Sequence, residues 1–138
     1  MTTVETTIPN TQAGIQRVSR IVDELASAHH LSENVVADIQ VALDEVLANI
    51  ISFGYPEGGV HEIWVRVTLV EHVLTAEIED DGKPFNPLEA ARPDLSGGLK
   101  ERRVGGLGIH FVRELMDAVE YARVENRNRL VLRRRTGR

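Results

Sequence analysis

The chain has 138 residues, of which 42% are hydrophobic and 27% are charged, which is typical of one soluble globular domain. It contains no cysteine, and this excludes disulfide bonds, thiolate zinc sites, iron–sulfur clusters and a cysteine nucleophile. No apolar run approaches the roughly 20 residues of a membrane span, and the polar residues 1–10 lack the layout of a signal peptide. We therefore expect one cytoplasmic domain that does not contact a membrane.

The formal net charge is −5, which argues against non-specific binding to nucleic acid, but the charge is unevenly distributed. Residues 123–138 hold seven Arg and one Glu, a net charge of +6, so residues 1–122 carry −11. Two interpretations of this basic segment remain open. It is either an edge strand that its charge keeps soluble and unpaired, or a contact for an acidic partner or a phosphate.

The first half of the chain predicts a strand followed by two helices. Residues 4–8 alternate between polar and apolar and stop at Pro9, which is typical of a short strand. Apolar residues then recur twice at helical spacing, the second time after Ser32, which we expect to cap the second helix. The two stripes that we expect to face the core are Ile15, Val18, Val22 and Leu25 within residues 12–28, and Val36, Ile39, Leu43, Val46 and Ile50 before Gly54 and Pro56.

The second half predicts two hairpins separated by a long loop and a helix. Alternation over residues 63–69 and 74–78 indicates the first hairpin, and residues 119–124 and 129–133 indicate the second, with its turn about residues 126–128. Residues 82–108 are too rich in Gly and Pro for a regular element, and loops of this length are typically functional or disordered. We expect a helix after Gly108, to about Asp117. This order of elements predicts an α+β two-layer sandwich, with helices covering one face of a single sheet.

Two pairs of residues, one on a predicted helix and one after a predicted strand, could take part in chemistry. Glu45 and Asn49 lie four residues apart on the second predicted helix, so they share a helical face. A carboxylate there could accept a proton beside an amide oxygen that ligates Mg²⁺, although a solvated helix flank has the same pattern. Asp80 and Gly82 follow a predicted strand, where a carboxylate could accept a hydrogen bond from an exocyclic amine and glycine would let a flat ring approach. Asp-Gly after a strand is also ordinary turn chemistry.

A third segment, Gly105-Gly106-Leu107-Gly108, opens the last predicted helix. Free backbone N–H groups at a helix start bind phosphate, although glycines here could also simply end the loop. The segment lacks the Gly-Lys-Ser/Thr of a Walker loop, and no parallel βαβ unit surrounds it, which argues against a dinucleotide fingerprint. An amine acceptor, a cation ligand and a phosphate cradle are together the three contacts that ATP with Mg²⁺ requires.

In this order and spacing, the three segments resemble the GHKL ATPase superfamily of gyrase, Hsp90, histidine kinases and MutL. Within that superfamily, the chain is most similar to bacterial anti-sigma-factor serine/threonine kinases, over about residues 5–135. The closer resemblance is carried by Gly54-Tyr55-Pro56, by Pro84-Phe85-Asn86-Pro87, and by Gly-Gly-Leu-Gly-Ile before Leu115-Met116-Asp117. It implies that residues 1–138 form one histidine-kinase-like ATPase domain of the Bergerat fold, in which a mostly antiparallel mixed sheet carries helices on one face.

The resemblance also implies a role for each motif residue. Glu45 would be the general base that takes a proton from a substrate serine, and Asn49 would be the Mg²⁺ ligand. Asp80 would accept a hydrogen bond from the adenine amine, with Gly82 giving clearance beneath the ring. The phosphates would be held by backbone N–H groups of Gly105, Gly106, Leu107 and Gly108 and by Arg103 or Arg102, within or beside an ATP lid at about residues 88–104.

The implied function is an ATP-dependent serine/threonine kinase that acts as an anti-sigma factor. It would phosphorylate a serine of an anti-anti-sigma (STAS-type) partner, sequester a sigma factor and form a homodimer, with no direct contact to nucleic acid. The chain departs from the family pattern at Phe53, where His is common, at Asn86, where Asp is usual, and at residues 126–128, where a Gly-Thr pair is common. The departures at Phe53 and Asn86 motivate an alternative, a nucleotide-gated binding module that regulates a partner by occlusion without chemistry.

Overall fold

The computed structural model describes residues 1–89 and 106–137, apart from the side chains of residues 106–108. The described elements are, in chain order, β1 (Thr2–Pro9), α1 (Gln12–Ala28), α2 (Glu33–Phe53), β2 (Glu62–Val70), β3 (Val73–Asp80), the short 3₁₀-helix η1 (Pro87–Glu89), α4 (Gly106–Leu115), β4 (Ala118–Val124) and β5 (Arg127–Arg135). None of the helices among these residues has the length and apolar character needed to cross a membrane.

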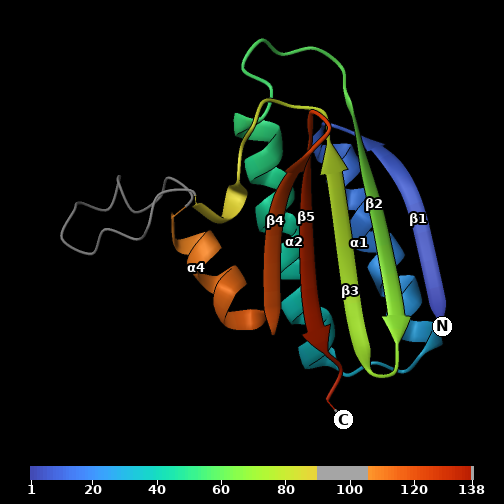
Figure 1. The fold of residues 1–138 in the computed structure, drawn as a ribbon. Helices are drawn as coiled ribbons and strands as arrows, with labels where there is room; N and C mark the ends of the chain where they lie inside the picture. Colours follow the sequence, from blue (N-terminus) through green and yellow to red (C-terminus); the bar gives the residue numbers. More distant parts are fainter. Residues whose placement is uncertain (90–105, 138) are drawn as a thin grey trace.

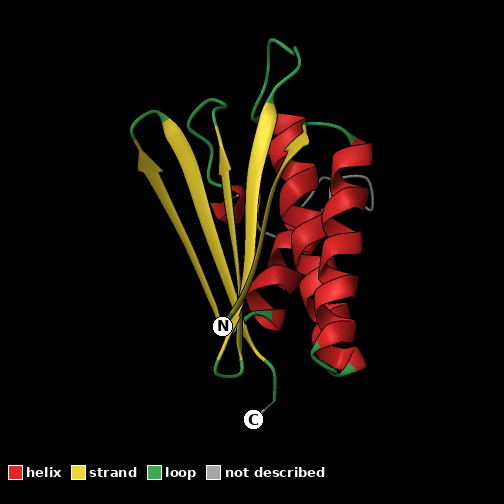
Figure 2. Cartoon of the chain, turned by 90° about the vertical axis from the view of Figure 1, so that its right-hand side faces the viewer, coloured by secondary structure: helices red, strands yellow, loops and turns green. Residues whose placement is uncertain are grey.

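The strands form one sheet in the order β1-β2-β3-β5-β4, with the helices on one of its faces (Figure 1 and Figure 2). The α+β two-layer class is therefore confirmed. Each of the four pairings between described strands is antiparallel, including that of β1 with β2, which two helices connect. The mixed character that we expected of the sheet is thus not observed in this part of the chain.

Local sequence signals account for the two long helices. The side chain of Thr11 accepts a hydrogen bond from the backbone N–H of Gly14 at the start of α1, and Ser32 accepts one from Val35 at the start of α2, as predicted. The core-facing stripe of α2 begins at Val35, which is buried, whereas Val36 is half-buried. The expectation for Val36 was wrong because Val35 lies four residues before Ile39, on the same helical row.

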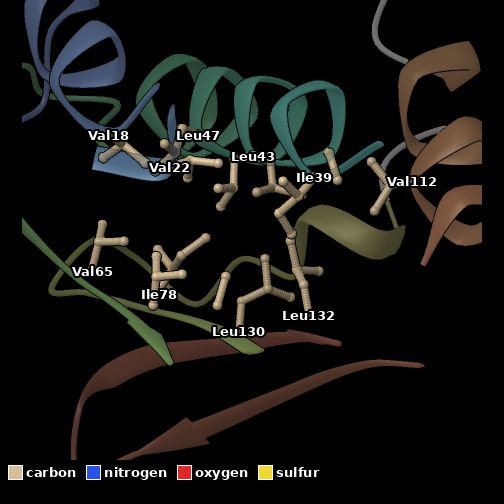
Figure 3. Close-up of a cluster of buried hydrophobic side chains, with 14 of the residues drawn as sticks. Val18, Val22, Ile39, Leu43, Leu47, Val65, Ile78, Val112, Leu130 and Leu132 are labelled. Atoms are coloured by element: carbon tan, nitrogen blue, oxygen red, sulfur yellow. The ribbon is translucent and has the colours of Figure 1, made fainter. Parts of the chain in front are cut away.

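The hydrophobic core fills the space between the helices and the sheet. Figure 3 shows Val18 and Val22 of α1 and Leu43 of α2 above Ile78 and Leu130 of the sheet. Alternate residues of each central strand point into this layer, which is the period-two pattern of a sheet with one covered face. Val112 of α4 completes the layer beside α2, so the helix that follows the glycine-rich segment is anchored by the same core.

The basic C-terminal segment forms β5, which lies between β3 and β4 and is not an edge strand. The edge-strand interpretation is therefore wrong, because the last hairpin inserts its second strand beside β3. Most of the arginines in β5 have acidic partners. These pairs are Arg127–Glu79 at 3.1 Å, Arg129–Glu77 at 2.5 Å and Arg133–Glu120 at 3.0 Å, together with Arg134–Asp38 at 2.8 Å, which joins β5 to α2. The charge of the segment is thus largely neutralised within the fold.

Candidate functional site

The C-terminal half of α2 carries Glu45 and Asn49, and the fold buries them to different degrees. Asn49 is 5% exposed, and its Nδ2 atom has no hydrogen-bond partner among the described residues. Glu45 is half-buried. Burial raises the pKa of the Glu45 carboxyl above its ordinary value, and the neighbouring Asp44 raises it further. A raised pKa makes a carboxylate a better proton acceptor, which is the property required of a general base.

Asp80 ends β3 and is 2% exposed, which is rare for an aspartate. Its Oδ1 atom accepts two hydrogen bonds, from the backbone N–H of Gly82 at 2.9 Å and from Nδ2 of Asn128 at 3.0 Å. Burial raises the pKa of Asp80, while these two bonds and the more distant Arg123 oppose that rise. The two donors therefore offset part of the cost of burying this charge, although burial remains the dominant effect on its pKa.

The turn after β3 lies against the end of α2. The backbone N–H of Lys83 donates to the carbonyl of Gly54 at 2.9 Å, and the guanidinium of Arg123 on β4 donates to the carbonyl of Gly82 at 2.9 Å. A Cβ atom on Gly82 would lie 2.5 Å from the oxygen of Gly54, so only glycine allows this approach. Asn49 precedes Gly54 by five residues of one helix, or about 7.5 Å along its axis. The motif on α2 and the motif after β3 are thus brought to the same end of the molecule.

The glycine-rich motif lies at the start of α4, which packs against α2. The helix begins at Gly106 rather than after Gly108, so the backbone of Gly106, Leu107 and Gly108 forms its first turn. The first four N–H groups of an α-helix have no partner within the helix, which is the arrangement that binds phosphate.

Part of the predicted phosphate-binding segment is outside the described residues. Gly105, Arg102 and Arg103 lie there, as does most of the predicted lid at residues 88–104. At the N-terminal boundary of the lid the structure differs from the prediction. Leu88 belongs to η1 and is buried in the core, and its carbonyl accepts a hydrogen bond from Arg113 of α4 at 2.7 Å. Leu88 is therefore an anchor on the folded domain.

The three departures from the family pattern have distinct surroundings. Phe53 packs its ring against that of Phe85, with centroids 5.8 Å apart. Asn86 accepts a hydrogen bond from the backbone N–H of Leu88 at 2.9 Å, which an aspartate would accept equally well. We expected Asn128 to lie in the last turn, but it does not. The turn is made by residues 125–126, both with positive φ, and β5 begins at Arg127.

Asn128 is the residue of this site that sequence reasoning missed. It is 3% exposed and faces Asp80 directly across the β3–β5 pairing. In the sequence it stands between two arginines close to a turn, a context that is typical of an exposed polar residue. The one sequence feature that indicated its burial is its spacing from Leu130 and Leu132, which face the core two and four residues later. Alternate residues of a strand share a face, so Asn128 lies on the core-facing side as well.

The residues near Asn49 fit a Mg²⁺ ion that is shared with a nucleotide. Among the described residues, no three His, Asp or Glu side chains are grouped as metal ligands, so the chain offers no complete cage. Mg²⁺ is commonly bound by one or two protein oxygens, with waters and substrate phosphates as the other ligands. Among the described residues, no side-chain hydrogen bond involves the amide of Asn49, so its oxygen is not committed to an internal partner and could serve as one of these ligands.

Comparison with known proteins identifies a domain family and relatives that are named protein kinases. The model of the histidine kinase-like ATPase domain matches residues 8–134. The serine/threonine-protein kinase BtrW of Bordetella bronchiseptica is 26% identical over 111 residues, which are 80% of this chain and 78% of that protein. The serine-protein kinase RsbW of Halalkalibacterium halodurans is 28% identical over 123 residues, which are 86% of this chain and 74% of that protein.

Two further similarities cover a smaller share of the other protein. The anti-sigma F factor of Bacillus subtilis is 31% identical over 84 residues, which are 61% of this chain and 58% of that protein. A crystal structure of the RsbU and RsbW domains of Rv1364c from Mycobacterium tuberculosis superposes with a TM-score of 0.68 at 16% identity. It covers 98% of this chain and 32% of that one, and at this identity the similarity concerns the fold alone.

Proposed function

The chain belongs to the histidine kinase-like ATPase domain family, and from that membership we propose that it is a serine/threonine protein kinase that binds ATP with Mg²⁺. The observation that carries the proposal is the arrangement of α2. One helix presents a half-buried carboxylate with a raised pKa and a buried amide, and its end is joined by a hydrogen bond to the turn that follows Asp80. The proposed base, cation ligand and adenine contact thus lie on two elements that a hydrogen bond joins.

In this proposal Asp80 accepts a hydrogen bond from the exocyclic amine of adenine, and Gly82 leaves room for the ring beside the backbone. The backbone N–H groups at the start of α4 hold the phosphates. Asn49 holds Mg²⁺ through its amide oxygen, and the bound ion supplies positive charge that offsets the charge of the transferred phosphoryl group. Arg103 or Arg102 within the lid, and Gly105 beside it, complete the phosphate contacts.

Glu45 acts in this proposal on the substrate serine. Its carboxylate takes the hydroxyl proton as the serine oxygen forms a bond to the γ-phosphorus, and the bond from that phosphorus to the bridging oxygen of ADP breaks. The products are phosphoserine, ADP and a protonated Glu45, which returns its proton to water. Phosphoryl transfer depends mainly on positioning and charge stabilisation, so one base, one ion and a phosphate cradle are sufficient.

The relatives that are named anti-sigma F factor and serine-protein kinase support a regulatory context. We place the chain in the cytoplasm as a homodimeric anti-sigma factor. It would sequester a sigma factor and phosphorylate a serine of a STAS-type anti-anti-sigma partner. The alternative, occlusion without chemistry, loses part of its motivation because Asn86 makes the capping bond that an aspartate would make.

Transfer of labelled γ-phosphate from ATP to a candidate STAS-type partner tests the proposal. We expect the native chain to form phosphoserine in the presence of Mg²⁺. Glu45→Gln should bind ATP with native affinity and lose transfer by about 100-fold or more, the contribution of a general base. Glu33→Gln is the matched control, because it makes the same change at an exposed position of the same helix.

Two outcomes would overturn parts of this proposal. Absence of ATP binding by the native chain would reject the nucleotide site as a whole. Native ATP binding with nucleotide-dependent partner affinity and no phosphoserine, for every partner that the chain binds, would reject the kinase and leave the occlusion module.

A further inference from the structure

Asn128 uses the whole hydrogen-bonding capacity of its side chain. Its Nδ2 group donates to Oδ1 of Asp80 at 3.0 Å and to the carbonyl of Lys83 at 2.8 Å. Its Oδ1 atom accepts from the backbone N–H of Phe85 at 3.2 Å and from the hydroxyl of Tyr121. A carboxamide has two N–H donors and two acceptor sites, so these four bonds leave nothing over.

These four bonds hold the amide in a single orientation. A reversed amide would place its oxygen against Oδ1 of Asp80 and the carbonyl of Lys83, and its NH₂ group against the N–H of Phe85. Each of these contacts would pair two acceptors or two donors, at a position that is 3% exposed. Burial makes such mismatches costly, because water cannot replace the lost partner.

The fixed amide determines which oxygen of Asp80 remains available. Oδ1 of Asp80 accepts from Asn128 and from the backbone N–H of Gly82. Among the hydrogen bonds of the described residues, none ends on Oδ2 of Asp80. Within residues 1–89 and 109–137, whose side chains the structure describes, the carboxylate is therefore held by Oδ1 alone, and the acceptor sites of Oδ2 are unused.

We propose that Asn128 is a positioning residue that sets base specificity, by orienting Asp80 so that Oδ2 accepts only from a base that carries an exocyclic amine at position 6. This inference rests on the proposed ATP site. Adenine has a donor at that position, whereas guanine has a carbonyl oxygen there, which would face a carboxylate oxygen without a proton between them. A site built around one acceptor rejects a ligand that leaves that acceptor unpaired.

Calorimetric binding of ATP and of purine riboside triphosphate, which lacks the 6-amine, tests the inference on the full chain. We expect the native chain to prefer ATP by roughly 10- to 100-fold, the range for one hydrogen bond to a charged group. In Asn128→Asp the residue opposite Asp80 becomes a second carboxylate, and we expect the preference to fall below about 3-fold. The matched control is Asn126→Asp, the same change at the exposed turn of the same hairpin, which should retain the native ratio.

The ratio of the two affinities distinguishes a positioning role from a general structural role, because a loosened fold would weaken the binding of both nucleotides by the same factor. A native ratio in folded Asn128→Asp would overturn the inference. If that variant does not fold, Tyr121→Phe decides, because it removes one bond to Asn128 and should lower the ratio by about 2- to 5-fold. An unchanged ratio in Tyr121→Phe would then reject the inference. Failure of the native chain to bind ATP would instead reject the proposed function.

Discussion

Gly82 lies against the carbonyl of Gly54, so closely that a Cβ atom at position 82 would come within 2.5 Å of that oxygen. The contact is between backbone atoms of two segments, and the adjacent N–H of Lys83 donates to the same oxygen at 2.9 Å. Neither segment can yield without moving the end of α2 or the turn after β3. This approach joins the two halves of the proposed nucleotide site.

Gly82→Ala is therefore expected to lower the free energy of unfolding by about 1–3 kcal/mol, the range for inserting an atom into packed structure. ATP affinity should fall with it, because the turn must move away from α2. Gly58→Ala is the control, since its Cβ would meet nothing within 4 Å and its cost comes from a positive φ of 73°. Urea unfolding and calorimetry measure both effects. Native ATP affinity in Gly82→Ala would show that the close approach is not needed for binding.

The rate of phosphate transfer should fall as the pH is lowered through the pKa of Glu45, because only the ionised carboxylate accepts a proton. Burial and Asp44 both raise that pKa, so the acidic limb of the rate profile should lie above the ordinary value of 4.5. Asp44→Asn removes the neighbouring negative charge and should move the limb to lower pH, with little change in the rate at pH 8. A limb that stays in place would show that Asp44 does not act on the base.

Asp80→Asn should stabilise the nucleotide-free chain at neutral pH. The pKa of Asp80 is raised in the folded state, mainly by burial, so the folded chain holds this proton more tightly than the unfolded chain. The contribution of Asp80 to stability therefore falls as the pH rises from 3.8 through the raised pKa. The gain in Asp80→Asn should be largest at pH 7 and shrink as the pH is lowered.

Urea unfolding at several pH values, with the exposed Glu57→Gln as control, measures the effect of Asp80→Asn. The same variant should lose ATP binding, because its NH₂ group would face the adenine amine. A gain in stability together with a loss of binding would show that Asp80 lowers the free energy of unfolding and is needed for binding ATP. A variant that is less stable than the native chain at pH 7 would contradict the burial argument.

The ion pair between Arg134 and Asp38 should contribute more to the free energy of unfolding than the adjacent pair Arg133–Glu120. Nε and Nη2 of Arg134 both donate to Oδ2 of Asp38, at 3.0 and 2.8 Å, and the two side chains are only 20% and 24% exposed. A double-mutant cycle to alanine should give a coupling energy of about 1–2 kcal/mol. The exposed pair Arg133–Glu120 is the matched control, for which we expect about 0.5 kcal/mol or less. Equal coupling in the two cycles would show that burial does not strengthen the pair.

The elements themselves could be predicted from the sequence because each depends on neighbouring residues. Ser32 caps α2 because its hydroxyl accepts from the backbone N–H three residues later. Glu45 and Asn49 share a helical face because residues four apart lie about one turn apart. The alternation in β2 and β3 likewise places Ile63 and Ile78 on the covered face of the sheet. The order of strands could not be predicted in the same way, because alternation says which face of a strand is buried and not which strand lies beside it.

Residues distant in sequence decided the rest of the site. Asn128 lies 48 residues after Asp80, and it became a partner of that carboxylate only because β5 inserts between β3 and β4 with Asn128 opposite Asp80. The same insertion gave the C-terminal arginines acidic partners on β3, β4 and α2. The sequence by itself determined the helices, the strands and the positions of the motif residues, since local periodicity and capping specify these. Only the tertiary structure decided which polar groups meet, because pairing and register between strands are set by packing across the whole sheet.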